Sequence, residues 1–324
     1  MKARLKKQAK HFGLPALVVF VLLILALLIP SLLNSRPMPI VNAHESVESV
    51  ADIVKLQTVM STLGIQKTIL HGIPNDLLYF EGEGVDLSDV DENNEAIKKA
   101  VAEYPDQFSY FCTLDPNDPL RNDVVESCVE DGAMGVKLYN GYSYAHETPV
   151  DDTKLNDFYA LLAEKGLLLM LPVNSSEYET ELRNMLTLNP DLTVICPHFC
   201  LSSKNLTRLS ALMTEFPNLY VDTSFGHIDF AKEGFQTLSD SHDDYEEFFE
   251  TFQDRILFGT DAVVTSYENK TVEWLDALYG DYISMLTDAD VVLQTVPDLS
   301  VQGLDLPYSI QKKIFYKNWN NITQ

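Results

Sequence analysis

Residues 167–173 read Leu-Leu-Leu-Met-Leu-Pro-Val, an apolar run without one polar side chain. This composition is typical of a strand that is buried on both faces, because a strand with one wet face alternates polar and apolar residues. Seven more short apolar runs follow residue 38, separated by segments that read as helices. Eight alternating strand–helix units predict an α/β fold, the closed parallel (β/α)8 or TIM barrel.

The strands and helices predicted from these runs can be given as ranges. The strands are expected at 39–44, 67–71, 108–113, 132–137, 167–173, 192–197, 219–222 and 256–259. The helices with the clearest signals are expected at 47–63, 95–104, 122–131, 152–165 and 308–322.

Each apolar run is followed by a polar residue that opens a loop. These residues are His44, His71, Thr113, Lys137, Asn174, His198, Asp222 and Asp261. The C-terminal ends of barrel strands meet at one rim, where active sites of this fold lie. His44, His198 and Asp261 are residue types that bind metals or move protons, so the pattern predicts an enzyme or the descendant of one.

The N-terminus differs in composition from the rest of the chain. Five basic residues in 1–13 precede an uncharged apolar stretch at 14–33, and about 20 such residues in a helix cross a bilayer. We expect a cytoplasmic tail at 1–13, a single-pass anchor at 14–33 and the barrel domain at 34–324 outside the cytoplasm of the cell membrane. A cleaved signal peptide is the alternative, although no A-x-A site follows.

The charge of the chain limits its partners. Removing the five basic residues of the tail from the net charge of −25 leaves −30 for the barrel domain. So acidic a surface repels phosphate backbones, which excludes nucleic acid as a partner and leaves a small-molecule substrate. The membrane is expected to be contacted through residues 14–33 alone. Barrels of this kind often pair, so a homodimer is a candidate assembly.

The cysteines and glycosylation motifs give weaker information. Cys112 and Cys196 end apolar runs and are expected as buried thiols, although an oxidising compartment would also permit disulfides. No C-x-x-C pair exists, which argues against a zinc knuckle. Four N-x-S/T triplets matter only if the chain enters a glycosylating pathway. They begin at Asn174, Asn205, Asn269 and Asn321.

Several local motifs occur in a consistent order along residues 38–324. They are Ile40-Val-Asn-Ala-His44-Glu-Ser46, Tyr104-Pro-Asp-Gln-Phe108, Gly132-Ala-Met-Gly-Val-Lys137-Leu138, Val194-Ile-Cys-Pro-His198, Asn218-Leu-Tyr-Val-Asp222-Thr-Ser224, Ile256-Leu-Phe-Gly-Thr-Asp261 and Ile314-Phe-Tyr-Lys-Asn318. Together they resemble the amidohydrolase superfamily of metal-dependent barrel hydrolases, in particular the amidohydrolase-related group that also holds aromatic-acid decarboxylases.

The resemblance implies roles for the rim residues. His44 and Asp261 correspond to ligands of a divalent metal, with zinc as the expected ion, and Asp261 also accepts the proton of the attacking water. His198 corresponds to the sixth-strand histidine, which contacts the substrate oxygen or a second metal. Lys137 is expected to be carboxylated, to act directly as a cation or base, or to be a structural partner of Asp261 or Asp222.

The sequence departs from the family pattern at three positions. Ser46 stands in place of the second histidine of the first strand, and Asn42 in place of the aspartate. The fifth-strand histidine is also missing, with Asn174 as its closest counterpart and Leu171 as the alternative register. Serine and asparagine oxygens bind zinc more weakly than imidazole, so an ordinary zinc site is in doubt.

Other residues are candidates for supporting roles. Replacement metal ligands are sought in His71, His146 and His227, each of which has an ordinary hydrogen-bonding role as its alternative. Substrate contacts are expected from Asn174, Asp222, Ser224 and His71. The tyrosines that follow strand four, Tyr139, Tyr142 and Tyr144, are candidates for lining the pocket.

Three functional hypotheses remain open at this point. The first is a membrane-anchored amidohydrolase-like hydrolase that acts on a small carbonyl, ester or amide substrate, with Asp261 as base and a metal-bound or positioned water. The second is a catalytically inactive barrel that serves as a binding or scaffold domain. The third keeps hydrolysis without a metal and uses Lys137 and Asp261 as acid and base.

Overall fold

The structure is a computed structural model that describes residues 38–78, 84–297 and 299–324. The predicted anchor at 14–33 lies outside these residues. The chain divides at residue 38, and the unit from Pro39 to Gln324 is the barrel. In the described part of the chain, no helix combines the length and apolar character that crossing a membrane requires.

Eight parallel strands form one sheet in the order of the sequence, which confirms the predicted (β/α)8 barrel. They are β1 (Ile40–Glu45), β2 (Ile65–His71), β3 (Phe108–Thr113), β4 (Gly135–Lys137), β5 (Leu168–Met170), β6 (Val194–Cys196), β7 (Leu219–Asp222) and β8 (Ile256–Leu257). The strands at 108–113 and 219–222 match their predicted ranges, while the apolar run 167–173 holds only three strand residues and continues into the rim.

Backbone hydrogen bonds close the barrel between β1 and the segment after β8. The amide of Ala43 donates to the carbonyl of Phe258, and the amide of Asp261 donates to the carbonyl of His44, both at 2.8 Å. Further along, Val264 donates to the carbonyl of Ser46 at 2.8 Å. Residues 258–264 therefore run alongside β1 toward the rim, and they place Asp261 beside His44.

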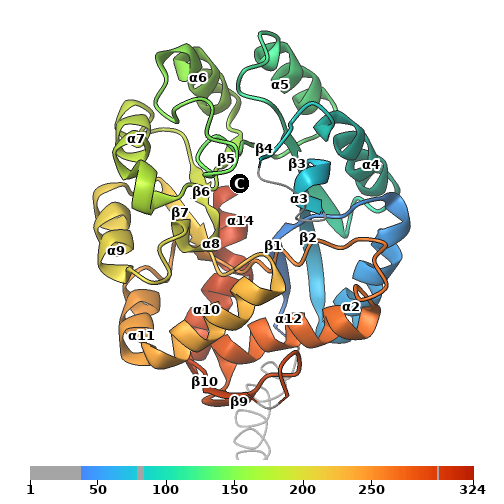
Figure 1. The fold of residues 1–324 in the computed structure, drawn as a ribbon, viewed down its shortest axis with the longest axis vertical. Coiled ribbons are helices and arrows are strands. Elements are labelled where there is room, and N and C mark those ends of the chain that lie inside the picture. The colour runs from blue at the N-terminus through green and yellow to red at the C-terminus, as the bar shows by residue number, and fades with distance from the viewer. Residues whose placement is uncertain (1–37, 79–83, 298) are drawn as a thin grey trace, which may run out of the picture. The chain divides into compact units, whose positions relative to one another are not determined.

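Helices surround the strands in chain order (Figure 1). The longer ones are α2 (Ile53–Leu63), α4 (Val90–Glu103), α5 (Arg121–Glu130), α6 (Asn156–Lys165), α7 (Ser175–Leu188), α9 (Leu206–Glu215), α10 (Ile228–Asp240), α11 (His242–Thr251) and α12 (Val272–Thr287). The shorter helical segments are η1 (Val50–Asp52), α3 (Asn75–Leu78), η2 (Thr153–Leu155) and α8 (Pro197–Cys200). The predicted closing helix is α13 (Tyr308–Lys312), the π-helical η3 (Lys313–Lys317) and α14 (Asn318–Ile322), and a small hairpin of β9 (Asp290–Val292) and β10 (Ser300–Gln302) precedes it.

The barrel interior is apolar below the rim. Its buried side chains come from six of the strands and from the last helix; they are Val41, Ala43, Ile69, Phe111, Leu168, Met170, Ile195, Leu257 and Trp319. Burial of apolar side chains contributes roughly 25 cal/mol per Å² removed from water, so this cluster stabilises the floor on which the rim residues stand.

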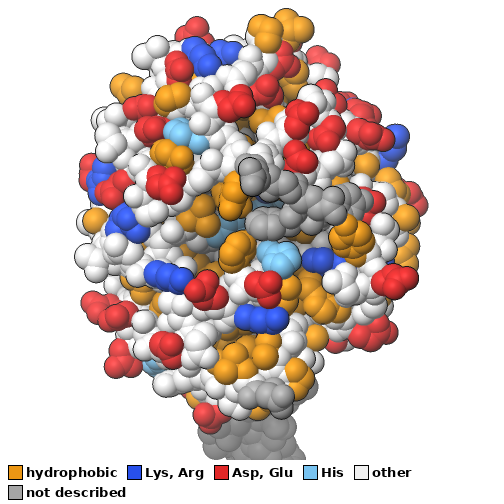
Figure 2. Space-filling view, in the orientation of Figure 1, with side chains coloured by type: hydrophobic (Ala, Val, Ile, Leu, Met, Phe, Trp, Pro, Cys, Tyr) orange, Lys and Arg blue, Asp and Glu red, His pale blue; other side chains and the backbone are white. Residues whose placement is uncertain are grey.

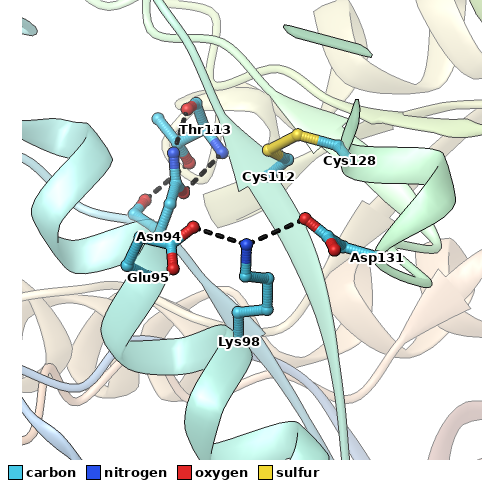
Figure 3. Close-up of a disulfide and its surroundings, with 8 residues drawn as sticks. Asn94, Glu95, Lys98, Cys112, Thr113, Cys128 and Asp131 are labelled. Atoms are coloured by element: carbon cyan, nitrogen blue, oxygen red, sulfur yellow. Dashed lines mark hydrogen bonds and ion pairs between the residues drawn. A yellow bond between two sulfur atoms is a disulfide. The ribbon is translucent and has the colours of Figure 1, made fainter. Parts of the chain in front are cut away.

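The expectation of buried thiols at Cys112 and Cys196 was wrong. Both cysteines are buried, but they form disulfides, Cys112–Cys128 and Cys196–Cys200. The first joins β3 to α5 beside an ion-pair cluster in which Lys98 bridges Glu95 and Asp131 (Figure 3). Sequence alone gave no pairing, because two cysteines 16 residues apart become neighbours only when the helix packs on the strand.

Acidic side chains are spread over the visible face of the molecule, as the negative net charge requires (Figure 2). Some hydrophobic and histidine side chains lie near the middle of this face, and others lie toward its edges (Figure 2).

Candidate functional site

His44 lies at the end of β1 and is fully buried. The register between β1 and β2 shifts between Asn42 and Glu45, beside this residue. The Nδ1 atom of His44 lies 2.8 Å from Oδ2 of Asp222. Because a carboxylate only accepts, Nδ1 carries the hydrogen, and the lone pair of Nε2 faces the mouth.

Asp222, at the end of β7, orients a second histidine through Ser224. The Ser224 hydroxyl donates to Oδ1 of Asp222 at 2.6 Å and lies 2.9 Å from Nδ1 of His198. Its hydrogen is already committed, so Ser224 accepts from Nδ1 of His198 and leaves the Nε2 lone pair free. Asp222 also accepts from the backbone amide of His198 at 2.9 Å. One buried carboxylate thus sets the tautomer of both imidazoles.

His198 stands in an unusual turn after β6. His198, Phe199, Cys200 and Leu201 have φ between 49° and 58°, the left-handed region. Each such residue without glycine costs about 1–2 kcal/mol, so the turn persists only because its surroundings hold it. Phe199 is one anchor, packed edge-on against Tyr245 and Phe249. The disulfide between Cys196 and Cys200 is another.

Asp261 also stands in a strained turn, with φ of 45°. Glu45 holds this turn: its carboxylate accepts from the backbone amides of Ala262 at 3.2 Å and Val263 at 2.9 Å, and from the Thr260 hydroxyl at 2.9 Å. Tyr279 of α12 donates to the same carboxylate from outside the barrel. Glu45 therefore points away from the mouth, as strand alternation predicts, and its function is to clamp the loop that carries Asp261.

The three predicted rim residues meet. Nε2 of His44 lies 3.5 Å from Oδ1 of Asp261, and Nε2 of His198 lies 3.5 Å from Oδ2. Burial lowers the pKa of His44 well below its usual value, which keeps that imidazole neutral. Burial alone would raise the pKa of Asp261, but the electrostatic interactions with the neighbouring His44, Lys137 and His198 outweigh it and lower that pKa. Asp261 is therefore held as a carboxylate.

Lys137, at the end of β4, lies on the other side of His44. Its Nζ donates to Nε2 of His44 at 3.0 Å, and the side chain is buried with Nζ 4.9 Å from the Tyr139 ring centroid. Burial lowers the pKa of Lys137, and the carboxylates of Asp261, Asp222 and Glu45 oppose that shift. The expected alternative of a direct structural pairing with Asp261 or Asp222 is replaced by a chain that runs Asp222–His44–Lys137.

These groups open onto a cavity of about 230 Å³ at the mouth. Its polar wall includes Lys137, His198 and Asp261, with Lys270 nearby. Its apolar wall includes Ile73, Leu77, Leu78, Tyr139, Tyr142, Pro172, Phe225 and Phe230. A volume of this order holds a small organic molecule, which suits one reactive group beside a modest apolar body.

The residues fit a divalent cation beside the Asp261 carboxylate. Oδ1 of Asp261 is buried without a hydrogen-bond partner, and the Nε2 lone pairs of His44 and His198 point at the same carboxylate. Two imidazoles and one carboxylate with an open position form the donor set of a catalytic metal site. His44, His198 and Asp222 also approach one another closely, but the Ser224 hydroxyl lies between them. We therefore infer that Asp222 orients the two histidines and is not itself a metal ligand.

Several predicted residues do not reach this centre. Asn174 caps α7 and contacts Ser176 and Ser143, while Pro172 takes the place at the end of β5 that faces the cavity. His71 lies behind His44, with ring centroids 4.9 Å apart, and its Nε2 donates to the carbonyl of Ala43.

The remaining predicted residues have other surroundings. His146 lies against Asn140 and Glu181, whereas His227 lines the cavity. Ser46 has a buried hydroxyl without a partner, and Asn42 exchanges hydrogen bonds with Thr260. Ser46 therefore supplies no imidazole, which leaves the site short of the family's usual ligands.

Sequence reasoning missed the clamp made by Glu45. The partners of its carboxylate in residues 260–263 are more than 200 positions away, and no local pattern indicates them. Sequence reasoning also missed Pro172, although the apolar run 167–173 that carries it was recognised. A proline in a strand cannot donate to the sheet, and this is a signal that β5 ends before it.

An eight-stranded parallel sheet in the order of the sequence, with two histidines and a carboxylate at its C-terminal mouth, places the chain in the class of TIM-barrel proteins. A model of the amidohydrolase family matches residues 79–318, and the chain belongs to this family. No curated protein matches the chain.

Solved structures share the fold at low identity. An uncharacterized TIM-barrel protein from Bordetella bronchiseptica aligns with a TM-score of 0.58 and 16% identity, over 88% of this chain and 98% of that one. The 5-carboxyvanillate decarboxylase of Sphingomonas paucimobilis aligns with a TM-score of 0.55 and 13% identity, over 88% of this chain and 99% of that one. A putative 2-pyrone-4,6-dicarboxylic acid hydrolase from Pseudomonas putida aligns with a TM-score of 0.56 and 12% identity, over 88% of this chain and 97% of that one.

Proposed function

We propose that this protein is a hydrolase of the amidohydrolase type that acts on a small carbonyl, ester or amide substrate bound in the mouth cavity. The observation that carries the proposal is the approach of both Nε2 atoms, of His44 and His198, to within 3.5 Å of the Asp261 carboxylate. Hydrogen bonds from Asp222 and Ser224 fix the two imidazoles, and hydrogen bonds to Glu45 fix the backbone turn that carries Asp261. This is the preorganisation that catalysis requires.

Asp261 is the general base in this proposal. A water between Asp261 and the Nε2 lone pair of His198 would donate one hydrogen to each and direct its own lone pair into the cavity. As its oxygen bonds to the substrate carbonyl carbon, its proton passes to Asp261. When the bond from that carbon to the leaving oxygen or nitrogen breaks, the same proton passes to the leaving group.

Lys137 is the electrophilic partner. Its Nζ lies on the cavity wall, where it would hydrogen-bond to the substrate carbonyl oxygen and stabilise the negative charge that develops there. The hydrogen bond to His44 restricts the amine to this position. The Asp222–His44–Lys137 chain thus links the electrophile to a buried carboxylate.

A divalent metal, with zinc as our first candidate, would be held by His44, His198 and Asp261. When bound, such an ion lowers the pKa of water and polarises a carbonyl. Lys137 donates to the same His44 nitrogen that a metal would need, so the lysine and the metal compete for one lone pair. Replacing Lys137 with methionine is therefore expected to raise the affinity for the metal. If Lys137 is instead carboxylated and serves as a ligand, the same substitution should lower that affinity.

The test combines turnover with metal content in the purified full-length protein. A panel of small esters, lactones and amides would be assayed for the wild type, for Asp261→Asn and for Asp243→Asn, whose side chain is fully exposed on α11. The proposal expects turnover that is lost only in Asp261→Asn. Turnover that survives in Asp261→Asn overturns it.

Metal content separates the remaining readings. Bound zinc, manganese and iron would be measured before and after chelation, with His44→Ala as the comparison. Metal that is bound stoichiometrically and lost in His44→Ala supports the metal-dependent form, while activity that is indifferent to chelator supports Lys137 as the sole cation. A folded protein with neither turnover nor metal favours the inactive binding or scaffold barrel.

We further propose that residues 14–33 tether the barrel to the outer side of the cell membrane. The uncharged stretch with five basic residues before it supports this placement, as does the pairing of all four cysteines, since disulfides persist in oxidising compartments. Alkaline extraction should leave the protein in the membrane pellet, and added protease should reach the barrel in intact cells. Recovery in the soluble fraction would refute the tether.

A further inference from the structure

The turn that carries His198 is bracketed by a disulfide. Cys196 is the last residue of β6, and Cys200 is the third of four consecutive residues in the left-handed region. Their Cα atoms lie 4.8 Å apart, and both side chains are completely buried. The bond therefore closes a five-residue loop with His198 at its centre.

Left-handed backbone without glycine needs an external constraint, and this segment has four such residues in a row. The other anchors act at the outer edge of the turn. Phe199 packs among aromatic rings, and the Ser175 hydroxyl donates to the Cys200 carbonyl at 2.8 Å. The disulfide alone joins the two ends of the turn covalently.

The position of His198 depends on this backbone. Its imidazole makes two contacts in opposite directions, Nδ1 with Ser224 at 2.9 Å and Nε2 with Asp261 at 3.5 Å. If His198 and its neighbours returned to right-handed or extended backbone, the Cα–Cβ direction would change and the ring could not keep both contacts. The bracketing bond thus constrains the one turn whose geometry decides the site.

We propose that the Cys196–Cys200 disulfide is a positioning device, which fixes the left-handed turn and so holds the His198 imidazole between Ser224 and Asp261. The proposal rests on the proposed function for its effect on catalysis. Reduction by a dithiol would transfer two electrons and two protons to the pair, give two thiols and release the constraint. Assembly of the site would then require an oxidising compartment.

The second disulfide is the matched control. Cys112–Cys128 is also buried, but it joins β3 to α5 and lies beside the Lys98 ion pairs in the outer layer (Figure 3). Its neighbour Phe111 faces the apolar interior, and neither cysteine lines the mouth cavity. Removing this bond affects stability without touching the turn after β6.

The experiment compares double variants of the full chain. In Cys196→Ala/Cys200→Ala we expect kcat to fall about 10–100-fold with KM nearly unchanged, because small displacements of catalytic groups cost this much. Cys112→Ala/Cys128→Ala should keep kcat within about twofold, because neither cysteine lines the mouth cavity and distant, independent sites are usually not coupled. Cys196→Ala/Cys200→Gly should recover part of the loss, since glycine adopts positive φ without strain.

A readout independent of turnover accompanies these assays. The rate at which diethyl pyrocarbonate modifies His198, followed by peptide mass spectrometry, should rise in Cys196→Ala/Cys200→Ala and stay unchanged in the control pair. If no variant, including the wild type, turns over any substrate, the proposed function fails while this rate still decides the inference.

The outcomes are unambiguous. If Cys196→Ala/Cys200→Ala does not fold, the wild type is reduced, its free thiols are alkylated and the same rate is measured. An unchanged His198 rate in folded protein that lacks the Cys196–Cys200 bond overturns the inference. So does an equal loss of kcat in both alanine pairs, because that would be a general effect of destabilisation.

Discussion

The turns after β6 and β8 solve the same problem with different chemistry. Each presents one candidate residue, His198 or Asp261, from backbone with positive φ. The turn after β6 is closed by a disulfide, whereas the turn after β8 is clamped by hydrogen bonds to the Glu45 carboxylate. The first constraint depends on redox conditions and the second on the ionisation of a buried acid, so the two halves of the site can be disabled separately.

The largest expected effect comes from the residue that the β8 turn presents. Asp261→Asn keeps the shape of the side chain but removes the base and the negative charge that lies beside the two Nε2 atoms. We expect kcat to fall about 10²–10⁴-fold, the range for losing a general base. Steady-state kinetics against Asp243→Asn checks this, and a loss below tenfold would remove Asp261 from the reaction.

The clamp itself is tested by Glu45→Gln. Glutamine keeps one acceptor oxygen and replaces the other with an NH2 group. That group faces either the amides of Ser46 and Val263 or the Ala262 amide and the hydroxyls of Thr260 and Tyr279, so buried donors lose their acceptor. An unsatisfied buried donor costs about 1–3 kcal/mol, so the free energy of unfolding should fall by about that amount. Chemical denaturation measures it, and kcat should fall as well. A variant with wild-type stability and kcat would show that the β8 turn holds without Glu45.

Acid pH should weaken the region where the two turns meet. Burial lowers the folded-state pKa of both His44 and His71 well below 6.5, so below about pH 6.5 the unfolded chain binds protons that the folded chain excludes. The histidines' effect is absent above that pH, and stability is lost as the pH falls, by up to about 1.4 kcal/mol per unit for each histidine.

Denaturation curves between pH 7.5 and pH 5, a range chosen around the ordinary histidine pKa of about 6.5, measure this slope. His71→Gln retains a donor for the Ala43 carbonyl but does not titrate, and its slope should be shallower than that of the wild type. Equal slopes in the two proteins would mean that His71 binds its proton in the folded state too.

The smallest effect is expected at Asn174, which lies outside the mouth centre. Its side chain caps α7, so Asn174→Ala should lower stability by about 1 kcal/mol, the usual value of a helix cap. Activity should stay within about twofold, because Pro172 and not Asn174 lines the cavity. Thermal unfolding and kinetics measure both quantities, and a large rise in KM would instead place Asn174 in the substrate site.

The sequence by itself determined the barrel and the meeting of His44, His198 and Asp261. Uninterrupted apolar runs mark strands buried on both faces, and parallel strands bring their C-terminal ends to one rim whatever their distance along the chain. The family motifs then predicted which residues form the candidate site, and they included Lys137, which lies beside His44.

Only the tertiary structure decided how these side chains are held. The Cys112–Cys128 bond, the Glu45 clamp and the Asp222–His44–Lys137 chain join residues that are distant in sequence. The Cys196–Cys200 bond joins near neighbours, but it lies in a turn with positive φ angles that the residue types do not predict. Packing in three dimensions determines the hydrogen-bond partners and the signs of the φ angles. A periodic pattern of polar and apolar residues does not encode either of them.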